Sequence, residues 1–404
     1  MPGMILKECP KVYMRETHRS RTPDSTLRFV QHMGDLIGMM DVRETSDLDR
    51  IGIPVFTCQR IRPDNSTTSH TGKGVSLIQA KVSLTMESIE RYSAEFKDEY
   101  RNTLVKGNYH RLKSSFNVLD PEKVILSQFR DYSHDRDIHW IWGFDVARCE
   151  DILIPACCVY HPFDLDDAFL IHTNTNGLAS GNTLEEAIVH GLAEVIERDA
   201  WSIARYTRNY RDALYIEDEP GNRFLVDIFE KFRDTDIEII AKDITSDIGV
   251  PVVASFSRDL IHPSMRPIDG FGAHLDPRVA MIRSILEIVT TRALSLQRFG
   301  IAGMREQITT YLGDYGDDDG DPRFYAHRQK GLRDLHTSYS DDILQDIKHI
   351  IGKLEERGLG RVIAVDLTRS ETGIPTVRVI VPGLESYCFD RTRMGERILK
   401  AAIT

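Results

Sequence analysis

The chain has 404 residues, of which 41% are hydrophobic and 28% are charged, and its formal net charge is −11. This length leaves room for one large domain or for two to three smaller ones, and the composition is typical of a soluble globular protein. The negative charge argues against general binding to nucleic acid or to an anionic membrane.

The sequence indicates neither export nor membrane insertion. Its N-terminus lacks the apolar stretch of a signal peptide, and no apolar run approaches ~18 residues. Six cysteines without a CxxC pair favour neither a disulfide framework nor a zinc site. We therefore expect a cytoplasmic protein.

The N-terminal segment, residues 1–65, mixes charge with short apolar runs. Within it, residues 29–40 are predicted as a helix and 53–62 as a strand. The polar stretch 63–74 has turn chemistry and is predicted as a loop. Lys73 stands there between two glycines, where backbone can approach a ligand closely, although no Walker A pattern surrounds it.

A Gly- and Asn-rich loop, residues 172–183, follows two predicted strands at 138–147 and 151–161. Thr183 ends this loop as a predicted helix N-cap, and Glu186 three residues later gives a capping-box pattern. A helix that begins from a polar, glycine-rich loop has a geometry suited to anion binding.

That helix, residues 186–198, presents one stripe of chemically active side chains. At ~100° per residue, the stripe contains Glu186, His190, Glu194 and Glu197. The pattern Glu-x-Ile-Glu-Arg that closes it also occurs earlier, at Glu87 and Glu90 in the predicted helix 81–96. Two such helices packed face to face would gather four carboxylates, and cations would have to offset their repulsion.

Hard divalent cations are the metals that such a site would select, because carboxylate oxygens without thiols favour Mg²⁺, Mn²⁺ or Ca²⁺. Mg²⁺ takes only one or two carboxylates per ion, so four glutamates suit more than one Mg²⁺ bridging a nucleotide triphosphate. A di-iron site would need Glu-x-x-His pairs, which the sequence lacks. The remaining alternative is a pair of solvated helix faces with Glu–Arg ion pairs.

The second half of the chain repeats a helix–strand–strand order. The predicted elements are helix 223–233 with strands 237–245 and 250–259, and helix 343–358 with strands 361–368 and 374–383. Together with the two copies of Glu-x-Ile-Glu-Arg, this order predicts an internally duplicated α/β architecture.

A third helix is predicted between these modules. Asp276 and the proline after it form a helix start that places Arg283 and Glu287 one turn apart. The acidic stretch 313–324 is predicted to be a solvated loop, because it lacks the spacing of an EF-hand. The last residues, 391–404, are predicted to contain a short helix.

These motifs resemble those of the YcaO superfamily of ATP-dependent enzymes that modify peptide backbones. The stretches that carry the resemblance are HTGKG (70–74), SLTMESIER (83–91), NGLASGNTLEEAIVHGLAEVIERDA (176–200), GAHLDPRVAMIRSILE (272–287) and PGLE (382–385). The resemblance implies a YcaO-like domain at residues 66–390. The third helix departs from the family pattern, with Thr290 and Thr291 where Gln and Ser are usual.

The resemblance implies a mixed α/β (α+β) fold whose duplicated modules surround a cleft for ATP and more than one Mg²⁺. It assigns Mg²⁺ binding to Glu87, Glu90, Glu194 and Glu197. It assigns nucleotide and phosphate contacts to Lys73, Ser83, Arg91, Ser180, Asn182, Glu186, Arg198, Arg283 and Glu287. His190 is the candidate catalytic base, and orienting a ligand carboxylate is its alternative role.

In the implied reaction, a nucleophile adds to a backbone amide carbonyl, ATP phosphorylates the resulting oxyanion, and phosphate leaves. A neighbouring Cys, Ser or Thr would give an azoline, whereas sulfide would give a thioamide. The chain resembles stand-alone archaeal members, for which the implied substrate is a glycine of the methyl-coenzyme M reductase α subunit. A TfuA-type partner would deliver sulfur, and a homodimer is expected. The alternatives are an azoline-forming cyclodehydratase and a non-catalytic ATP-binding accessory protein.

Overall fold

A computed structural model describes most of the chain. It covers residues 3–403 except positions 63, 131, 166, 168, 169, 211, 264 and 266 and the segment 312–327, and it leaves the side chains of 302–311 undescribed. The predicted acidic loop 313–324 therefore lies outside the described residues. Among the described residues, no helix combines the length and apolar character that crossing a membrane requires.

The N-terminal part forms a three-stranded antiparallel sheet covered by helices. Its elements are β1 (Tyr13–Met14), β2 (His18–Arg19), α1 (Pro23–Val30), α2 (Met33–Leu36), β3 (Met39–Glu44), β4 (Val55–Ile61), β5 (Thr67–Lys73) and α3 (Leu77–Ala94). The sheet order is β3-β4-β5, and α3 packs on it.

Two sequence predictions in this part are wrong. The predicted loop 63–74 is largely strand β5, because its threonine-rich residues pair with β4 over the whole register from Ile61–Thr67 to Val55–Lys73. The predicted helix 29–40 breaks into the end of α1, the short α2 and the start of β3. Gly38 marks that change with φ +76°, a left-handed conformation that suits glycine.

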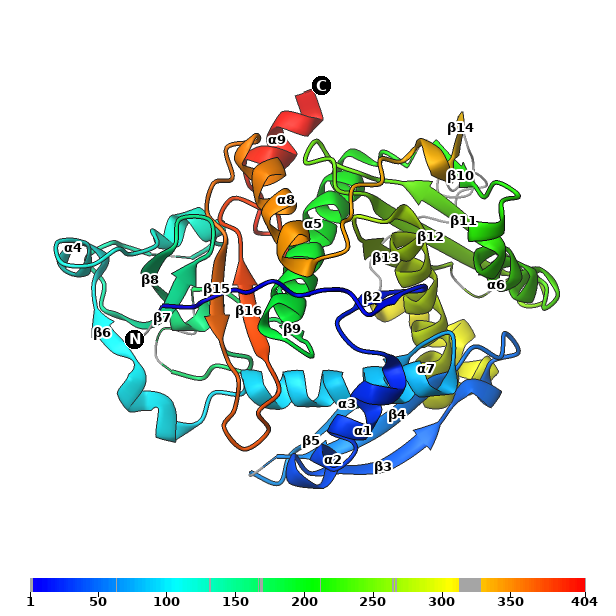
Figure 1. Cartoon of the computed structure of the whole chain (residues 1–404), viewed down its shortest axis with the longest axis horizontal. Coiled ribbons are helices and arrows are strands. Elements are labelled where there is room, and N and C mark those ends of the chain that lie inside the picture. The colour runs from blue at the N-terminus through cyan, green and yellow to red at the C-terminus, as the bar shows by residue number, and fades with distance from the viewer. Residues whose placement is uncertain are drawn as a thin grey trace.

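The two larger sheets flank the long helix α5 (Leu184–Thr207), as Figure 1 shows. One has the order β13 (Ile268–Ala273), β12 (Val252–Asp259), β11 (Ile237–Asp243), β10 (Asp212–Tyr215), β14 (Arg328–Gly331). The other has the order β6 (Val105–Gly107), β7 (Ile138–Asp145), β15 (Ile363–Asp366), β16 (Thr376–Ile380), β9 (Leu178–Ser180), with β8 (Glu150–Pro155) also paired to β7.

The remaining helices are α4 (Tyr109–Lys113), α6 (Arg223–Arg233), α7 (Pro277–Tyr311, with a break at Gly300), α8 (Ile343–Glu355) and α9 (Glu396–Ile403). Of these, α6 and α7 pack on the first of the two larger sheets, and α8 and α9 pack on α5. Short 3₁₀ turns lie at Ser46–Leu48, Asp98–Thr103, Pro121–Val124, Ala156–Cys158, Pro220–Asn222 and Leu332–Asp334. The main hydrophobic core joins side chains of α5 and α8 to strands of both sheets, including Leu192, Ile347, Phe256 and Val379.

The predicted mixed helix and strand fold is confirmed, and so are the two helix–strand–strand modules. In the first, α6 is followed by the antiparallel pair β11–β12, and in the second, α8 is followed by the antiparallel pair β15–β16. Each module contributes to a different one of the two sheets that flank α5.

A further repeat is a strand–turn–helix unit that occurs three times, as β5–α3, β9–α5 and β13–α7. The residues before the helices are Ser76, Thr183 and Asp276, and their carbonyls accept hydrogen bonds at 3.0–3.1 Å from the amides of Ala80, Ala187 and Ala280. Glutamate stands eleven residues after each of these starts, at Glu87, Glu194 and Glu287. The three helices therefore share one sequence spacing from their start to this glutamate, and equivalent positions can face one space.

Glycine permits the close packing of strand on helix in these units. A Cβ added at Gly272 would lie 2.2 Å from the Ala280 carbonyl oxygen, and one at Gly72 would lie 2.2 Å from the Ala80 carbonyl oxygen. We predict that Gly272→Ala lowers the free energy of unfolding by about 1–3 kcal/mol, because helix backbone must shift. Denaturant unfolding measures this change.

The matched control is Gly352→Ala on α8, where no atom lies within 4 Å of the added Cβ. Alanine has the higher helix propensity by about 1 kcal/mol, so this variant should be as stable as the wild type or more so. Equal effects of the two substitutions would contradict the packing explanation.

A buried ion cluster ties residues 49–50 to α7 and β12. Arg292 donates to Asp49 at 2.7 Å and to Asp259 at 3.2 Å, and Arg50 donates to Asp259 at 2.7 Å. Burial would raise the pKa of Asp259, but hydrogen bonds from Arg50, the His262 amide and Arg292 lower the pKa to about 2. The contribution of Asp259 to the free energy of unfolding is therefore fully present at pH values above the pKa that Asp259 has in the unfolded chain.

We predict that the free energy of unfolding falls as the pH drops from about 4 to about 2, because Asp259 is protonated in the unfolded chain before it is protonated in the folded one. In Asp259→Asn, the free energy of unfolding should be lower at neutral pH and should change less between pH values of about 4 and about 2. Asp41→Asn is the control, since that side chain is 52% exposed. An unchanged acid slope in Asp259→Asn would refute the assignment.

Candidate functional site

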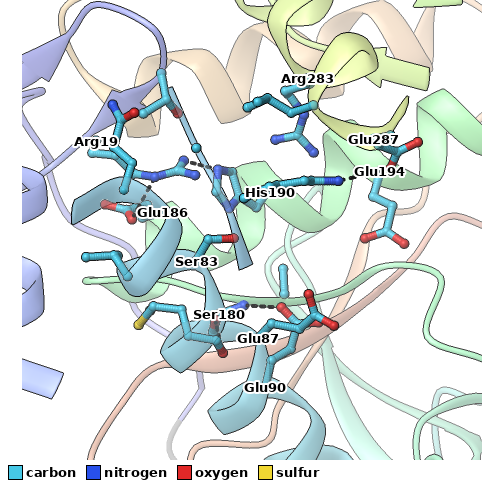
Figure 2. Close-up of a pocket in the computed structure, with 18 of the residues that line it drawn as sticks. Arg19, Ser83, Glu87, Glu90, Ser180, Glu186, His190, Glu194, Arg283 and Glu287 are labelled. Atoms are coloured by element: carbon cyan, nitrogen blue, oxygen red, sulfur yellow. Dashed lines mark hydrogen bonds and ion pairs between the residues drawn. The ribbon is translucent and has the colours of Figure 1, made fainter. Parts of the chain in front are cut away.

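One cavity of about 410 Å³ lies where α3, α5 and the N-terminal part of α7 meet the N-terminal segment. Every site residue predicted from the sequence lines it: Lys73, Ser83, Glu87, Glu90, Arg91, Ser180, Asn182, Glu186, His190, Glu194, Glu197, Arg198, Arg283 and Glu287. Figure 2 draws 18 of the lining residues and labels ten, with Glu87 and Glu90 on one side and Glu194 and Glu287 on another. Their placement is established, and their chemical roles stay predictions.

Four glutamates enter the cavity from two equivalent helices. Glu87 and Glu90 come from α3, and Glu194 and Glu197 come from α5. The Glu90 carboxylate accepts a hydrogen bond from the Ser180 amide at 3.2 Å, and that of Glu197 accepts one from the Ala273 amide at 3.1 Å. Backbone amides thus hold two of the four carboxylates in place. The Glu87 carboxylate lies 3.9 Å from the Arg91 guanidinium.

These four carboxyl groups resist ionisation. Burial raises the pKa of Glu90 to about 8, although Arg91 opposes the shift. Burial likewise raises the pKa of Glu197 to about 7 against the effect of Arg198, and it raises the pKa of Glu87 and of Glu194. Nearby carboxylates add to the shift, because like charges disfavour a shared ionised state. A cation bound beside these carboxyl groups would therefore stabilise their ionised forms.

A preorganised group of cations surrounds Glu287, next to the glutamates of α5. The Glu287 carboxylate lies 3.7 Å from Lys73 Nζ and 3.7 Å from Arg198 Nη2, and it accepts the Phe271 amide at 3.0 Å. Burial would raise the pKa of Glu287, but Lys73 and Arg198 hold that pKa below its ordinary value. Glu287 therefore stays ionised and keeps both cations in place.

The Arg198 guanidinium is held by aromatic rings as well as by acids. It lies 5.3 Å from the ring centre of Trp201 and 5.2 Å from that of Phe389, and it pairs with Glu197 at 3.3 Å. Its buried Nε has no hydrogen-bond partner among the described residues. An unpaired guanidinium N–H that lines a cavity is a donor available to an anionic ligand.

The N-terminal segment closes one side of the cavity, which the sequence did not predict. Glu186 accepts hydrogen bonds from the Ser20 amide at 3.0 Å and the Ser20 hydroxyl at 2.7 Å. Asn182 donates to Glu186 at 2.9 Å and accepts from the Thr26 hydroxyl at 2.9 Å. Glu186 and Asn182 thus anchor this segment, and the only sequence signal for it is the basic run that contains Arg19.

His190 faces Arg19, and the two side chains contact each other through His190 Nε2. Burial, followed by the charges of Arg19 and Arg283, lowers the pKa of His190 well below its ordinary value. The imidazole is therefore neutral near pH 7. Burial lowers the pKa of Arg19 to about 10, so Arg19 remains charged and donates to the ring.

The donor set in the cavity fits hard divalent cations. Its acidic ligands are all carboxylate oxygens, and their raised pKa values show that a cation would stabilise the ionised forms. Their ligand atoms are too widely spaced to form a group of three within 4.8 Å of one another. This spacing suits several ions along the cavity better than one ion shared by all four glutamates.

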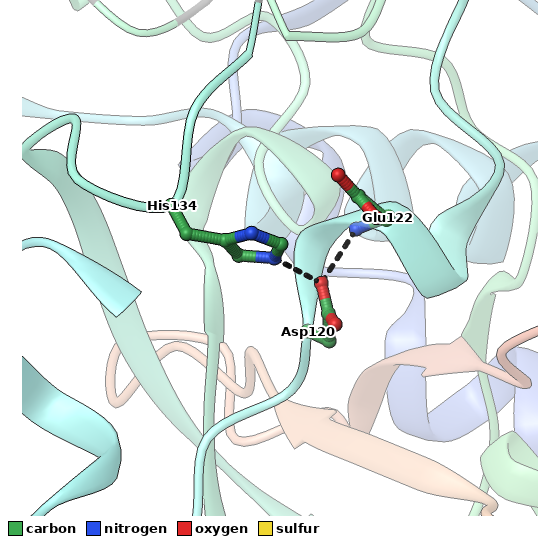
Figure 3. Close-up of side chains that lie close together, drawn as sticks. All are labelled: Asp120, Glu122 and His134. Atoms are coloured by element: carbon green, nitrogen blue, oxygen red, sulfur yellow. Dashed lines mark hydrogen bonds and ion pairs between the residues drawn. The ribbon is translucent and has the colours of Figure 1, made fainter. Parts of the chain in front are cut away.

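A compact group of ligand atoms does occur elsewhere, at Asp120, Glu122 and His134 (Figure 3). His134 Nε2 lies 2.9 Å from an Asp120 oxygen, which also accepts the Glu122 amide at 3.1 Å. Ordinary hydrogen bonding at a half-exposed turn accounts for this arrangement, so the cavity remains the candidate metal centre.

The YcaO family, described as ATP- and Mg²⁺-binding YcaO cyclodehydratases, matches residues 71–385. An uncharacterized protein of Methanothermobacter thermautotrophicus is 35% identical over 392 residues, which are 93% of this chain and 97% of that protein. An uncharacterized protein encoded in the tfuA 3′ region of Rhizobium leguminosarum bv. trifolii is 26% identical, covering 91% of this chain and 88% of its own length.

Solved structures show the same relationship. The YcaO protein of Methanopyrus kandleri bound with AMPPCP and Mg²⁺ has a TM-score of 0.75 and 30% identity, covering 96% of this chain and 98% of that one. A heterocyclase in complex with substrate and cofactor shares the fold, with a TM-score of 0.84 and 24% identity, over 98% of this chain but only 56% of the heterocyclase. The chain belongs to the YcaO family.

Proposed function

We propose that this protein uses ATP and Mg²⁺ to activate a peptide backbone amide. The observation that carries the proposal is the meeting of four ionisation-resistant glutamates and a fixed group of cations in one cavity. Cations that neutralise the glutamates would also neutralise a triphosphate, and the lysine and arginine side chains would take the remaining phosphate charge.

In this proposal Glu87, Glu90, Glu194 and Glu197 hold more than one Mg²⁺ ion. The residues that contact the nucleotide are Lys73, Ser83, Arg91, Ser180, Asn182, Glu186, Arg198, Arg283 and Glu287. Of these, Glu287 acts indirectly, by positioning Lys73 and Arg198. Binding of AMPPCP and Mg²⁺ by the Methanopyrus kandleri protein supports the proposal, because the two chains match over nearly their whole lengths.

The proposed chemistry solves a leaving-group problem. Bound ATP supplies a phosphoryl group to the oxygen of the tetrahedral adduct, so that this oxygen leaves as phosphate. Lys73, Arg198 and Arg283 face the space where negative charge develops, and Glu287 keeps the first two from shifting. Such preorganised charge lowers a barrier because no reorganisation is needed during the reaction.

His190 is proposed as the catalytic base. Its neutral imidazole can accept a proton, although Nε2 first has to be released by Arg19. While Arg19 contacts Nε2, the role of His190 is to orient the Arg19 guanidinium. Movement of the N-terminal segment would therefore couple substrate entry to exposure of the base.

For the substrate, we propose a glycine of the methyl-coenzyme M reductase α subunit, which would be converted to a thioamide with sulfide as the nucleophile. The near full-length match to the Methanothermobacter thermautotrophicus and Methanopyrus kandleri proteins supports a stand-alone enzyme, whereas the heterocyclase matches over about half of its chain. The relative encoded beside tfuA supports a TfuA-type sulfur-delivering partner. A homodimer is proposed as the functional assembly.

Two other functions would use the same cavity differently. An azoline-forming cyclodehydratase would take its nucleophile from a Cys, Ser or Thr side chain of the substrate, as the relation to heterocyclases allows. A non-catalytic accessory protein would bind ATP without turning it over. Thioamidation is favoured because the chain matches the Methanothermobacter thermautotrophicus and Methanopyrus kandleri proteins over nearly their whole lengths.

We predict that Glu194→Gln and Glu197→Gln each lower substrate-dependent phosphate release by about 10²-fold or more, because an amide cannot neutralise Mg²⁺. Both variants should fold without metal, since removing a buried carboxylate relieves like-charge repulsion. Phosphate release and thermal unfolding measure the two effects.

Glu396→Gln on α9 is the matched control, because its carboxylate is 84% exposed and lies outside the cavity. It should retain full turnover. Normal phosphate release in both cavity variants would remove the metal-binding assignment of these glutamates.

We further predict the product. Purified protein with a glycine-containing substrate peptide, sulfide, ATP and Mg²⁺ should give a peptide heavier by one O-to-S exchange, detected by mass spectrometry. Loss of water from a Cys-bearing peptide without this exchange would instead favour azoline formation. Absence of both changes, together with no substrate-dependent phosphate release, would favour the accessory protein.

A further inference from the structure

A cluster of arginines surrounds Glu95 at the C-terminal end of α3, away from the cavity lining. Arg60, on β4, contacts the Glu95 carboxylate through Nη2, and Arg62 Nε donates to the same oxygen at 2.6 Å. Arg369, from the turn before β16, donates to the Glu95 carbonyl at 2.5 Å. Three guanidinium groups therefore share one acidic residue.

This cluster is buried and its charges do not balance. The exposed fraction is 1% for Arg60, 5% for Glu95 and 6% for Arg369. The neighbouring Glu371 binds Lys97 at 3.6 Å and the Tyr92 hydroxyl at 2.7 Å, and Glu99 also pairs with Lys97. Lys97 therefore has two acids, and the four cations and three acids of this group leave one positive charge uncompensated, which is costly in a buried place.

The cluster also contains buried donors without acceptors. Among the described residues, Arg60 Nε and Nη1, Arg369 Nε and Ser93 Oγ have no hydrogen-bond partner. Ser93 is fully buried and lies two residues before Glu95 on α3. Buried polar groups in native proteins have partners, and water could satisfy these donors but could not neutralise their charge.

We propose that a small monovalent anion binds among Arg60, Arg369 and Ser93. Aromatic rings limit the space, since Arg60 lies 5.6 Å from the ring centre of Tyr92 and Arg369 lies 4.1 Å from that of Tyr100. A halide or hydrosulfide ion meets the charge and size requirements, whereas a phosphate would bring a second charge and a larger volume. Arg62, whose side chain is 26% exposed, marks the side that faces solvent.

The position of this site relates it to the cavity. Glu95 is the C-cap residue that follows α3, and the four residues from Glu90 to the last helical residue, Ala94, rise by about 6 Å along the helix axis. An anion at this site would thus be held one to two turns beyond the proposed metal ligands. The anion site is inferred independently of the proposed function. Only the choice of hydrosulfide as a probe rests on that function.

The first test measures thermal unfolding of the full chain without nucleotide, titrated with sodium chloride or bromide against sodium gluconate at equal ionic strength. We expect a saturable rise of the unfolding temperature with the halides alone. Diffraction from crystals grown in bromide should show an anomalous peak among Arg60, Arg369 and Ser93. An equal rise with gluconate, or the absence of a peak there, would overturn the proposal.

Variants tie the effect to the cluster. Arg60→Met should lose the halide effect, while Arg43→Met should keep it, because Arg43 lies in the same sheet but is 64% exposed. Glu194→Gln should also keep it, which separates this site from the ATP cavity. If Arg60→Met does not fold, Ser93→Ala should raise the half-saturating halide concentration by about fivefold. An unchanged value would contradict the site.

A competition experiment with hydrosulfide tests which anion the site binds. Added anaerobically to bromide-bound protein, it should lower the bromide peak if it occupies the same site, which would assign the site to sulfide chemistry. An unchanged bromide peak would assign the site to halide alone, and the proposed thioamidation would keep its own test through product mass.

Discussion

Burial of four glutamates in one space is the constraint on which this cavity depends. It raises the pKa of Glu90 to about 8 and that of Glu197 to about 7, so without bound cations these two carboxyl groups favour their protonated forms near neutral pH. Lys73 and Arg198 cannot relieve this strain alone, because Glu287 already engages both of them. Additional cations, which the fold itself does not supply, are the physical requirement that links this arrangement to Mg²⁺ and a triphosphate.

The threefold strand–turn–helix unit explains how the chain builds such a site. Equivalent positions seven residues after each helix start hold Ser83, His190 and Arg283, and all three line the cavity. The third unit has Thr290 where the other two have Glu90 and Glu197. Two helices therefore bring pairs of carboxylates, and the third brings an arginine and the ion-paired Glu287. In the proposed function, this difference between the third helix and the other two would separate the metal ligands from the phosphate-binding cations.

The sequence predicted the features that local chemistry determines. Helix periodicity placed Glu194 and Glu197 on one face, and Thr183 is the N-cap whose hydroxyl accepts the Glu186 amide at 3.1 Å. Strand β5 was missed because polar residues 63–74 resemble a turn until β4 pairs with them. Arg19 and Ser20 were missed because their contacts with His190 and Glu186 span more than 160 residues. Such contacts are set by tertiary packing, which no local pattern encodes. The anion cluster likewise appears only when β4, α3 and the turn at Arg369 come together.

A crystal structure with a non-hydrolysable ATP analogue and Mg²⁺ tests the central claim most directly. The expected result is more than one Mg²⁺ ion coordinated by oxygens of Glu87, Glu90, Glu194 and Glu197, with phosphate oxygens near Lys73, Arg198 and Arg283. Binding of the nucleotide outside the cavity, or ions that contact none of the four glutamates, would contradict it.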